Sequence, residues 1–247
     1  MRGKVYIVGA GVGDPEYITL KAYRILGKAE AVVYDRLIPR GVLDYCNPNA
    51  ELIYAGKAPG KHTLSQDEIN QLLYDLSKNH RVVVRLKGGD PLVFGRGEEE
   101  CAYLLEKGVP CEIVPGITSF QSAAAKHLIT LAGRGLASAF TVATGVQSSS
   151  TRWRLDYREL AGIPGTLVFV MTASRAARII DEVASVRGPG EYGAIIELIG
   201  EEGENAICGP LRTLKVYAEE NGVRNPAILI IGRSVELGAR YDWIKCM

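Results

Sequence analysis

The sequence predicts an α/β protein built from two α/β domains, and three observations lead to this interpretation. Short apolar runs rich in β-branched residues alternate with segments of helical periodicity along the chain. Several of these runs end directly in a glycine or a charged residue. The dipeptide Pro115-Gly116 then interrupts the pattern. We therefore expect an N-terminal domain of residues 1–115 and a C-terminal domain of residues 116–247.

In the first half of the chain, each predicted strand is a short apolar run bounded by turn-forming residues. These strands cover residues 4–8, 31–34, 51–55, 82–86 and 111–114. Helical periodicity lies between them, at residues 19–27, after Ser65, and at residues 98–107. Ser65 and Glu68 have the spacing of a capping box, and Gly108 is typical of a left-handed helix C-cap.

In the second half, Thr118 or Ser119 can cap a helix that follows the Pro115-Gly116 hinge. The predicted strands cover residues 139–143, 166–170, 193–198 and 227–231. Further helices are expected near residues 174–186 and 213–220, and residues 147–152 have the composition of a loop.

Composition excludes several classes of protein. The formal net charge of +1 argues against a nonspecific nucleic-acid-binding protein, which would carry a basic excess. No apolar stretch approaches the roughly 20 residues of a membrane-spanning helix. The five cysteines are odd in number and form no CxxC pair, which disfavours both a zinc site and the disulfide framework of a secreted protein. A reducing cytoplasm is the expected compartment.

The segment Arg81 to Glu100 is the most informative part of the chain. Its apolar run ends abruptly in Gly88-Gly89-Asp90, where the glycines leave no Cβ between the backbone and a bound molecule. Ligands of open α/β sheets bind outside the carboxyl ends of the strands. This loop is therefore predicted to form one wall of a ligand site.

Two further charged residues, Asp35 and Lys57, stand at or just past predicted strand ends, as Asp90 does. Each alone is common in a solvated turn, but in one parallel sheet all three would share an edge. A carboxylate and an ammonium group beside a glycine loop suit a reaction that moves protons.

A dinucleotide-binding fold is the competing interpretation, because Gly9, Gly11 and Gly13 follow the first predicted strand. The match is imperfect, since Asp14 and Pro15 stand where that fingerprint continues into a helix. A nicotinamide-dependent oxidoreductase thus remains an alternative.

Taken together, the motifs resemble those of the tetrapyrrole methyltransferase family over nearly the whole chain. The matching segments are VYIVGAGVGDPEYITLKA (5–22), VVYDRLIP (32–39), AGK (55–57), VRLKGGDPLVFGRG (84–97), VPGITS (114–119), RGLAS (134–138), TLVFVM (166–171) and NPAILIIG (225–232). The combination of YDRL with GGDPxxFGRG narrows the resemblance to members that methylate uroporphyrinogen III.

This resemblance implies transfer of methyl groups from S-adenosylmethionine to two carbons of uroporphyrinogen III, giving precorrin-2 and S-adenosylhomocysteine. It implies a pathway toward siroheme or cobalamin. The family fold has two α/β domains with the cofactor in the cleft between them, and its members are usually homodimers. No metal is required.

Site residues follow from the resemblance by position. Asp35 is implied as proton acceptor and Lys57 as proton donor. The implied cofactor-binding residues are Val12, Gly88, Gly89, Asp90, Val93, Thr118, Ser119, Met171, Gly200, Pro226 and Ala227. Because the implied substrate is a polycarboxylate, nearby cations are candidates to bind it. These cations are Arg36, Lys61, Arg85, Lys87, Arg96 and Arg134.

The chain departs from the family pattern most seriously in one region. Residues 128–135 read LITLAGRG where the family segment resembles GIPLTHRG, and Val146 replaces the histidine of a TGH motif. Because these changes fall where the substrate is expected to bind, a methylase of a later corrin intermediate remains an alternative. A cofactor-binding sensor without catalytic activity is another.

Overall fold

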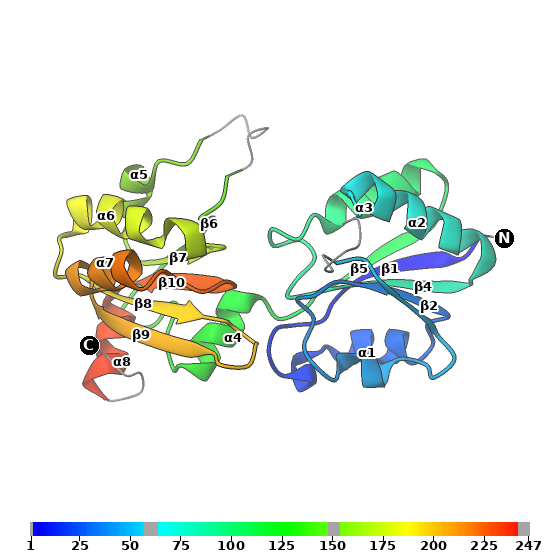
Figure 1. Ribbon diagram of the computed structural model, residues 1–247, viewed down its shortest axis with the longest axis horizontal. Helices are drawn as coiled ribbons and strands as arrows, with labels where there is room; N and C mark the ends of the chain where they lie inside the picture. Colours follow the sequence, from blue (N-terminus) through cyan, green and yellow to red (C-terminus); the bar gives the residue numbers. More distant parts are fainter. Residues whose placement is uncertain (1, 57–63, 148–153, 242–247) are drawn as a thin grey trace. The chain divides into compact units, whose positions relative to one another are not determined.

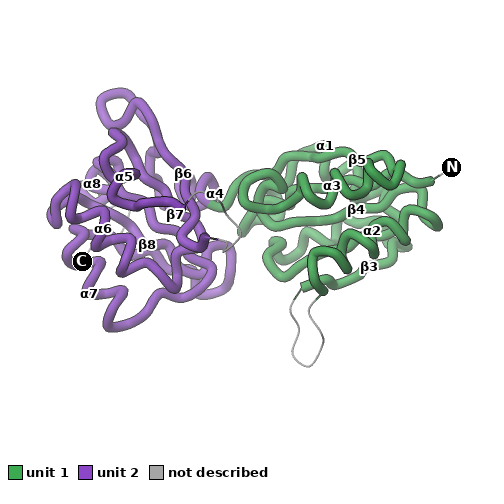
Figure 2. Tube along the Cα trace, turned by 90° about the horizontal axis from the view of Figure 1, so that it is seen from above, with its two compact units in different colours: residues 1–119 green, residues 120–247 purple. Residues whose placement is uncertain are grey.

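The computed structural model describes residues 2–56, 64–147 and 154–241, which divide into two compact units (Figures 1 and 2). Unit 1 comprises residues 1–119 and unit 2 residues 120–247, so the division falls after Ser119. Each unit holds a five-stranded sheet with helices packed against it. The predicted fold class, two α/β units, is confirmed.

Unit 1 is a parallel sheet between two layers of helices. Its strands are β1 (Lys4–Gly9), β2 (Ala31–Tyr34), β3 (Glu51–Tyr54), β4 (Val82–Lys87) and β5 (Cys111–Val114), in the order β3-β2-β4-β1-β5. One face carries α1 (Leu20–Leu26), and the other carries α2 (Gln66–Asn79) and α3 (Gly97–Glu106) (Figure 1). All of these elements were predicted to within a few residues.

Local signals fix where the unit 1 helices begin and end. The Thr19 side chain accepts a hydrogen bond from the backbone N–H of Ala22 and caps α1. Ser65 and Glu68 form the predicted capping box at the start of α2. Gly108 follows α3 with φ +72°, the left-handed conformation expected there.

The strand order of unit 1 creates a switch point between β1 and β4. The chain leaves β1 and passes across β4 to reach β2, whereas it leaves β4 and passes across β1 to reach β5. The loops after β1 and β4 therefore diverge to opposite faces of the sheet. Ligands of open α/β sheets bind at such points, outside the carboxyl ends of the strands.

Unit 2 contains a mixed sheet. Its strands are β6 (Phe140–Thr144), β7 (Thr166–Val170), β8 (Tyr192–Glu197), β9 (Asn205–Pro210) and β10 (Ala227–Ile231), in the order β6-β7-β10-β8-β9. Only β6 and β7 are parallel neighbours. The pairs β7–β10, β10–β8 and β8–β9 are antiparallel.

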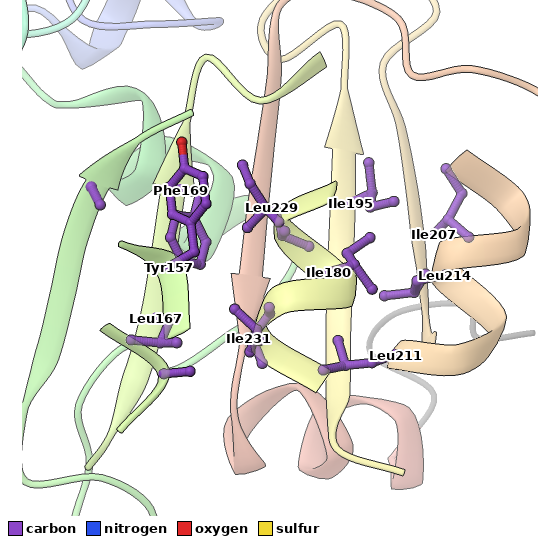
Figure 3. Packing of buried hydrophobic residues seen from close by; sticks show 14 residues of the cluster. Tyr157, Leu167, Phe169, Ile180, Ile195, Ile207, Leu211, Leu214, Leu229 and Ile231 are labelled. Carbon is purple, nitrogen blue, oxygen red and sulfur yellow. The ribbon is translucent and has the colours of Figure 1, made fainter. Parts of the chain in front are cut away.

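Helices of unit 2 cover one face of this sheet with α5 (Tyr157–Ala161), α6 (Ala176–Arg187) and α7 (Leu211–Glu220). Figure 3 shows the resulting core, in which Tyr157 packs edge-to-face against Phe169 with ring centroids 5.6 Å apart. On the other face α8 (Arg233–Arg240) contacts β8 and β9, and α4 (Ser119–Lys126) begins the unit (Figure 1).

The sequence patterns missed β9, α5 and α8. Strand β9 has the sequence NAICGP, whose glycine and proline are unfavourable for a strand. It lies at the edge of the sheet, where pairing with β8 on one side is sufficient to form it. The short α5 is defined by its cap, because Asp156 accepts hydrogen bonds from the N–H groups of Arg158 and Glu159.

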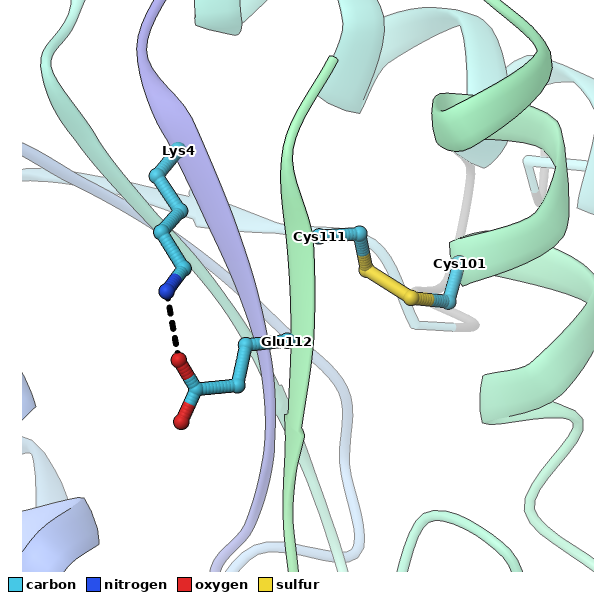
Figure 4. Close-up of a disulfide and its surroundings, with 4 residues drawn as sticks. All are labelled: Lys4, Cys101, Cys111 and Glu112. Carbon is cyan, nitrogen blue, oxygen red and sulfur yellow. Dashed lines mark hydrogen bonds and ion pairs between the residues drawn. A yellow bond between two sulfur atoms is a disulfide. The ribbon is translucent and has the colours of Figure 1, made fainter. Parts of the chain in front are cut away.

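A disulfide joins Cys101 on α3 to Cys111 at the start of β5 (Figure 4). The sequence disfavoured a secreted disulfide framework and did not predict this bond. The turn at Gly108 reverses the chain and brings the two Cα atoms to 5.6 Å, which the spacing in sequence alone could not show. Beside it, Glu112 forms ion pairs with Lys4 and Lys21. Cys46 is a buried free thiol.

Replacing both cysteines in the variant Cys101→Ala/Cys111→Ala opens a loop with a sequence separation of 10 residues. Because the cross-link restricts the unfolded chain, we expect the free energy of unfolding to fall by roughly 2–3 kcal/mol, measured by urea denaturation without reductant. Added dithiothreitol should destabilise the wild type by more than it destabilises the variant, because only the wild type has the Cys101–Cys111 bond to lose. Free thiols at both positions in a peptide map of the unreduced, denatured wild type would contradict this prediction.

Candidate functional site

Three loops meet backbone to backbone at the carboxyl edge of the unit 1 sheet. Between the loops after β1 and β4, the N–H of Gly89 donates to the Gly11 carbonyl at 2.8 Å, and the N–H of Gly11 donates back at 3.3 Å. The loop after β5 is equally close, because a Cβ on Gly116 would lie 2.2 Å from the carbonyl oxygen of Gly89. We call this surface, formed by Gly9, Gly11, Gly88, Gly89 and Gly116, the glycine edge.

Asp90 ties the glycine edge together through its side chain. One carboxylate oxygen accepts a hydrogen bond from the N–H of Leu92 at 2.8 Å, and the other accepts one from the N–H of Gly116 at 3.0 Å. The carboxylate thus orders its own loop and connects it to the loop after β5. Its main contribution inside unit 1 is to hold the backbone of the two loops in place.

Asp35 follows β2 and lies against the same edge. Its Oδ1 accepts a hydrogen bond from the N–H of Leu37 at 3.1 Å, which fixes the turn. The carbonyl oxygen of Leu37 comes so close to Gly88 that a Cβ on Gly88 would lie only 2.2 Å from it. Glycine at position 88 is what allows the Asp35 turn to approach the loop after β4.

The loop after β4 comes close to Val12 and Ser119. Gly89 has φ +73°, and a Cβ there would meet Val12 and the N–H of Ser119 at 3.8 Å. Gly89 is buried and its N–H and carbonyl are bonded to Gly11, whereas Gly88 is partly exposed. Because glycine has no side chain, the main chain at Gly88 is open to a ligand, and its polar groups fit a small cofactor. The structure brings together Val12, Gly88, Gly89, Asp90 and Ser119, which the family resemblance implies as cofactor-binding residues.

Asp35 is joined to three buried charged residues, Arg85, Lys87 and Glu100. We call these four residues the Glu100 network. Arg85 donates from Nη2 to Asp35 Oδ2 at 3.2 Å and from Nε to Glu100 Oε1 at 3.2 Å. Lys87 Nζ donates to the same Glu100 oxygen at 3.0 Å. Burial lowers the pKa of Lys87, and the positive charge of Arg85 acts in the same direction, while Glu100 opposes both.

Arg85 and Lys87 are therefore placed differently from what a role in substrate binding would need. Both are buried and face Glu100 on α3, within unit 1. This geometry favours an internal electrostatic role over direct contact with a substrate carboxylate. The sequence missed Glu100, although an isolated pair of basic residues in an otherwise apolar strand is a signal that a buried acid must lie nearby.

The other candidate cations lie elsewhere. Arg36 and Arg134 are exposed, and Arg134 stands in the turn closed by the Gly133–Ala137 bridge. Arg96 is exposed too and pairs with Glu99 through two hydrogen bonds of 2.9 and 2.7 Å. Lys57 and Lys61 lie outside the described residues.

Val93 and Thr118 complete the unit 1 candidates. Val93 is exposed in the loop between β4 and α3, and its N–H donates to the Asp90 carbonyl. Thr118 is buried next to Ser119.

In unit 2, the candidate residues gather at one edge of the mixed sheet. Met171 follows β7 in a left-handed conformation with φ +55°, and its side chain is exposed. The next residue, Thr172, donates from its hydroxyl to the Ala227 carbonyl at 3.2 Å. The N–H of Ile199 donates to the Pro226 carbonyl at 3.3 Å, which brings the turn that holds Gly200 to the same edge.

Glu204 anchors that turn. Its Oε2 accepts hydrogen bonds from the N–H of Gly200 and from Lys126, both at 2.9 Å, and its Oε1 lies 2.8 Å from His127 Nε2. Burial by itself would raise the pKa of Glu204, but the bonds from His127, Gly200 and Lys126 outweigh it and lower the pKa to about 2.

The segment that departs from the family pattern lines a groove of about 540 Å³ in unit 2. Residues of α4, the segment 128–132 and Phe140 form its walls, and most of them are apolar. Leu128 is exposed and has φ +52°. The segment that differs from the family pattern thus forms one wall of this groove.

Within residues 2–56, 64–147 and 154–241, no group of three or more His, Cys, Asp or Glu side chains is placed to hold a metal ion. Nor does any helix in this part of the chain have the length and apolar character to cross a membrane.

The geometry also removes the basis for a dinucleotide-binding fold. The glycine loop after β1 leads into the short 3-10 turn Pro15–Tyr17, and α1 begins only at Leu20. The helix that should receive a pyrophosphate is therefore displaced from the glycines.

Comparison with known proteins shows the family of the chain. Residues 4–215 match the family model of the tetrapyrrole (corrin/porphyrin) methylases. The uroporphyrinogen-III C-methyltransferase of Bacillus subtilis is 36% identical over 244 residues, covering 98% of this chain and 95% of that protein. The siroheme synthase of Chromobacterium violaceum is 40% identical over 244 residues, but the chain spans only 52% of its length.

Among solved structures, the uroporphyrin-III C-methyl transferase of Thermus thermophilus in complex with S-adenyl homocysteine is 41% identical, with a TM-score of 0.79. The match covers 95% of this chain and 100% of that one. The fold and these relatives define the class of protein, that of the methylases with two α/β units. The chain belongs to the tetrapyrrole (corrin/porphyrin) methylase family.

Glu204→Gln tests the anchor of the Gly200 turn. A lowered pKa means that the ionised form stabilises the fold above the unfolded-state value of 4.5 and that this contribution is lost as the pH falls toward 2. We expect the variant to be less stable by on the order of 2 kcal/mol at pH 7, with a gap that narrows below pH 4.5. Urea denaturation across this pH range measures it, with the exposed Glu220→Gln as control. A gap independent of pH would refute the anchor.

Proposed function

We propose that the protein transfers methyl groups from S-adenosylmethionine to uroporphyrinogen III, forming precorrin-2 and S-adenosylhomocysteine. The observation that carries the proposal is the position of Asp35 beside the glycine edge, in a chain of the tetrapyrrole methylase family. A surface for a cofactor and a group that can accept a proton lie next to each other there.

The residues of the glycine edge bind the cofactor in this proposal. Main-chain groups of Gly88 offer hydrogen bonds, and Gly89, Val12 and Ser119 offer contact at a fixed position, because Asp90 holds the two loops together. When bound, the cofactor supplies an electrophilic methyl group. The protein has to orient the reacting carbon, and orientation of this kind supplies much of the rate enhancement in group transfer.

Asp35 accepts the proton that the ring system loses on methylation. Its carboxylate is about a quarter exposed, at 27%, so it remains accessible from the surface. The hydrogen bond from Arg85 to Oδ2 holds this carboxylate in a fixed orientation. Lys57 is proposed as the proton donor by position alone.

The exposed arginines Arg36, Arg96 and Arg134, with Lys61, are proposed to attract the carboxylates of the substrate. Met171, Gly200, Pro226 and Ala227, which gather at one edge of unit 2, are proposed as its share of the cofactor site. The pathway toward siroheme or cobalamin belongs to the same proposal.

We also propose that the two units are separate domains and that the protein is a cytoplasmic homodimer. The support for the last two points is the resemblance to the family. Disulfides are rare in the cytoplasm, so a persistent Cys101–Cys111 bond in protein isolated from cells would weigh against that compartment.

A second candidate is a methylase of a later corrin intermediate, favoured by the altered segment that lines the groove of unit 2. The two candidates share the cofactor and differ in the substrate, so a comparison of turnover on the two substrates separates them.

Incubation of the purified protein with S-adenosylmethionine and uroporphyrinogen III should give a product heavier by two methyl groups, detected by mass spectrometry under anaerobic conditions. A later corrin intermediate should be turned over more slowly. Absence of any mass gain with uroporphyrinogen III, together with turnover of the corrin, would replace the first candidate by the second.

Asp35→Asn separates proton transfer from binding. We expect kcat to fall by about 100-fold or more, because a general base contributes on that scale, while calorimetric affinity for S-adenosylmethionine changes little. Asp90→Ala should instead weaken the affinity for S-adenosylmethionine, because it releases the N–H groups of Leu92 and Gly116 and so loosens the two loops. Equal loss of affinity in both variants would contradict the assignment of Asp35.

A further inference from the structure

A buried carboxylate lies at the edge of unit 2 where Gly200, Pro226 and Ala227 gather, and the proposed function makes no use of it. It belongs to Glu197, the last residue of β8, whose side chain is only 1% exposed. On the adjacent strand β10, the residue paired with Glu197 is Ala227. A carboxylate removed from water needs a partner, and the partner shows what the pair can do.

Arg224, in the loop that leads into β10, is this partner. Its backbone N–H donates to Glu197 Oε1 at 3.1 Å, and its Nε donates to Oε2 at 3.0 Å. Its Nη2 lies 2.9 Å from the same Oε2. Because backbone and guanidinium both bind one carboxylate, the chain at Arg224 is fixed in position against the end of β8.

The same guanidinium also reaches the loop after β8, where Nη2 donates a long hydrogen bond of 3.5 Å to the carbonyl of Gly203. This loop is sharply bent, since Leu198, Gly200 and Gly203 have φ values of +53°, +78° and +81°. The left-handed conformation is unfavourable for a leucine, so contacts from outside the loop are needed to hold it.

Two links thus join the loop before β10 to the loop after β8. One is the backbone bond from the N–H of Ile199 to the Pro226 carbonyl at 3.3 Å, and the other is the Arg224 side chain. Glu204 fixes the loop after β8 through the N–H of Gly200. Arg224 therefore connects a loop that is already anchored to the loop that carries Pro226.

We propose that Glu197 and Arg224 are positioning residues of the cofactor site: their ion pair holds the loop before β10 against the turn that carries Gly200. The inference rests on the proposed function, which assigns Gly200, Pro226 and Ala227 to the binding of S-adenosylmethionine. A surface that is formed before the ligand arrives loses less conformational freedom on binding, and the difference is gained as affinity.

A double variant removes this link without leaving an unpaired charge in the interior. In Glu197→Gln/Arg224→Met both charges are lost together, which avoids the large penalty of breaking a buried pair from one side. The new amide oxygen at position 197 can still accept the backbone N–H of residue 224, so the guanidinium links alone disappear. Arg224→Lys keeps the positive charge beside Glu197 but replaces the planar guanidinium by a single ammonium group.

The matched control is Arg178→Met/Glu182→Gln, the same two changes in an ion pair on α6. Arg178 donates from Nε to Glu182 Oε1 at 2.8 Å, and its side chain is 65% exposed. This pair covers a helix surface and joins no loops of the candidate site, so the control should bind the cofactor as the wild type does.

Calorimetric titration with S-adenosylhomocysteine measures the effect. We expect Kd to rise about tenfold in Glu197→Gln/Arg224→Met and about threefold in Arg224→Lys. In the methylation assay, KM for S-adenosylmethionine should rise while kcat at saturating cofactor stays near the wild-type value, because the lost interaction serves ground state and transition state alike. Hydrogen exchange at the N–H of Ile199 should be about tenfold faster in the double variant, since this bond joins the two loops.

A general loss of packing predicts a different pattern, in which affinity falls only as far as thermal stability falls and kcat falls with it. That pattern, or an unchanged Kd in a folded double variant, would overturn the proposal. If the double variant does not fold, an unchanged Kd in Arg224→Lys has the same force.

The binding measurement needs no tetrapyrrole. A wild type that binds S-adenosylhomocysteine but methylates no tetrapyrrole would defeat the proposed reaction, and the Kd values of the variants would still decide this inference. A wild type that binds no S-adenosylhomocysteine would defeat both.

Discussion

The close approach of backbone at the glycine edge is the constraint on which the candidate site depends. A Cβ atom on Gly88 or on Gly116 would lie only 2.2 Å from a carbonyl oxygen of a neighbouring loop, which is too close for any side chain. Any side chain there would push the loops after β1, β2, β4 and β5 apart. Because they stay together, Asp35 lies beside Gly88, and Val12 and Ser119 lie beside Gly89. The order of strands brings these loops to one switch point, and the glycines let them touch.

Much of the fold could be predicted because its signals are local. The capping box at Ser65 and Glu68 and the β-branched run of β4 each depend on neighbours in sequence, and the structure has both elements. Strand β9 could not be predicted in this way, since its sequence is a poor strand and its partner β8 supplies the stabilisation. The Cys101–Cys111 bond could not be predicted either, because it depends on a turn that brings two cysteines together from 10 residues apart in the sequence.

For the site, the sequence identified residues by type and position but not by environment. Gly88, Gly89 and Asp90 were found because glycines after a buried strand have a direct meaning for the backbone. Arg85 and Lys87 were interpreted as cations for a substrate, since sequence does not reveal that Glu100 comes from α3 to meet them. A charge in the interior needs a partner, and the partner lies 15 residues from Arg85 along the chain.

The burial of the Glu100 network has a consequence for ionic strength. Mobile ions screen charges in water over about 8 Å at physiological salt, but they cannot enter the packed interior around Arg85 and Glu100. Arg36, Arg96 and Arg134 stand in solvent, where added salt weakens long-range attraction. The buried charges and the exposed charges of the molecule therefore respond differently to added salt. Attraction of a charged ligand by the exposed arginines weakens as salt is added, whereas the buried contacts among Arg85, Lys87 and Glu100 are largely insulated from it.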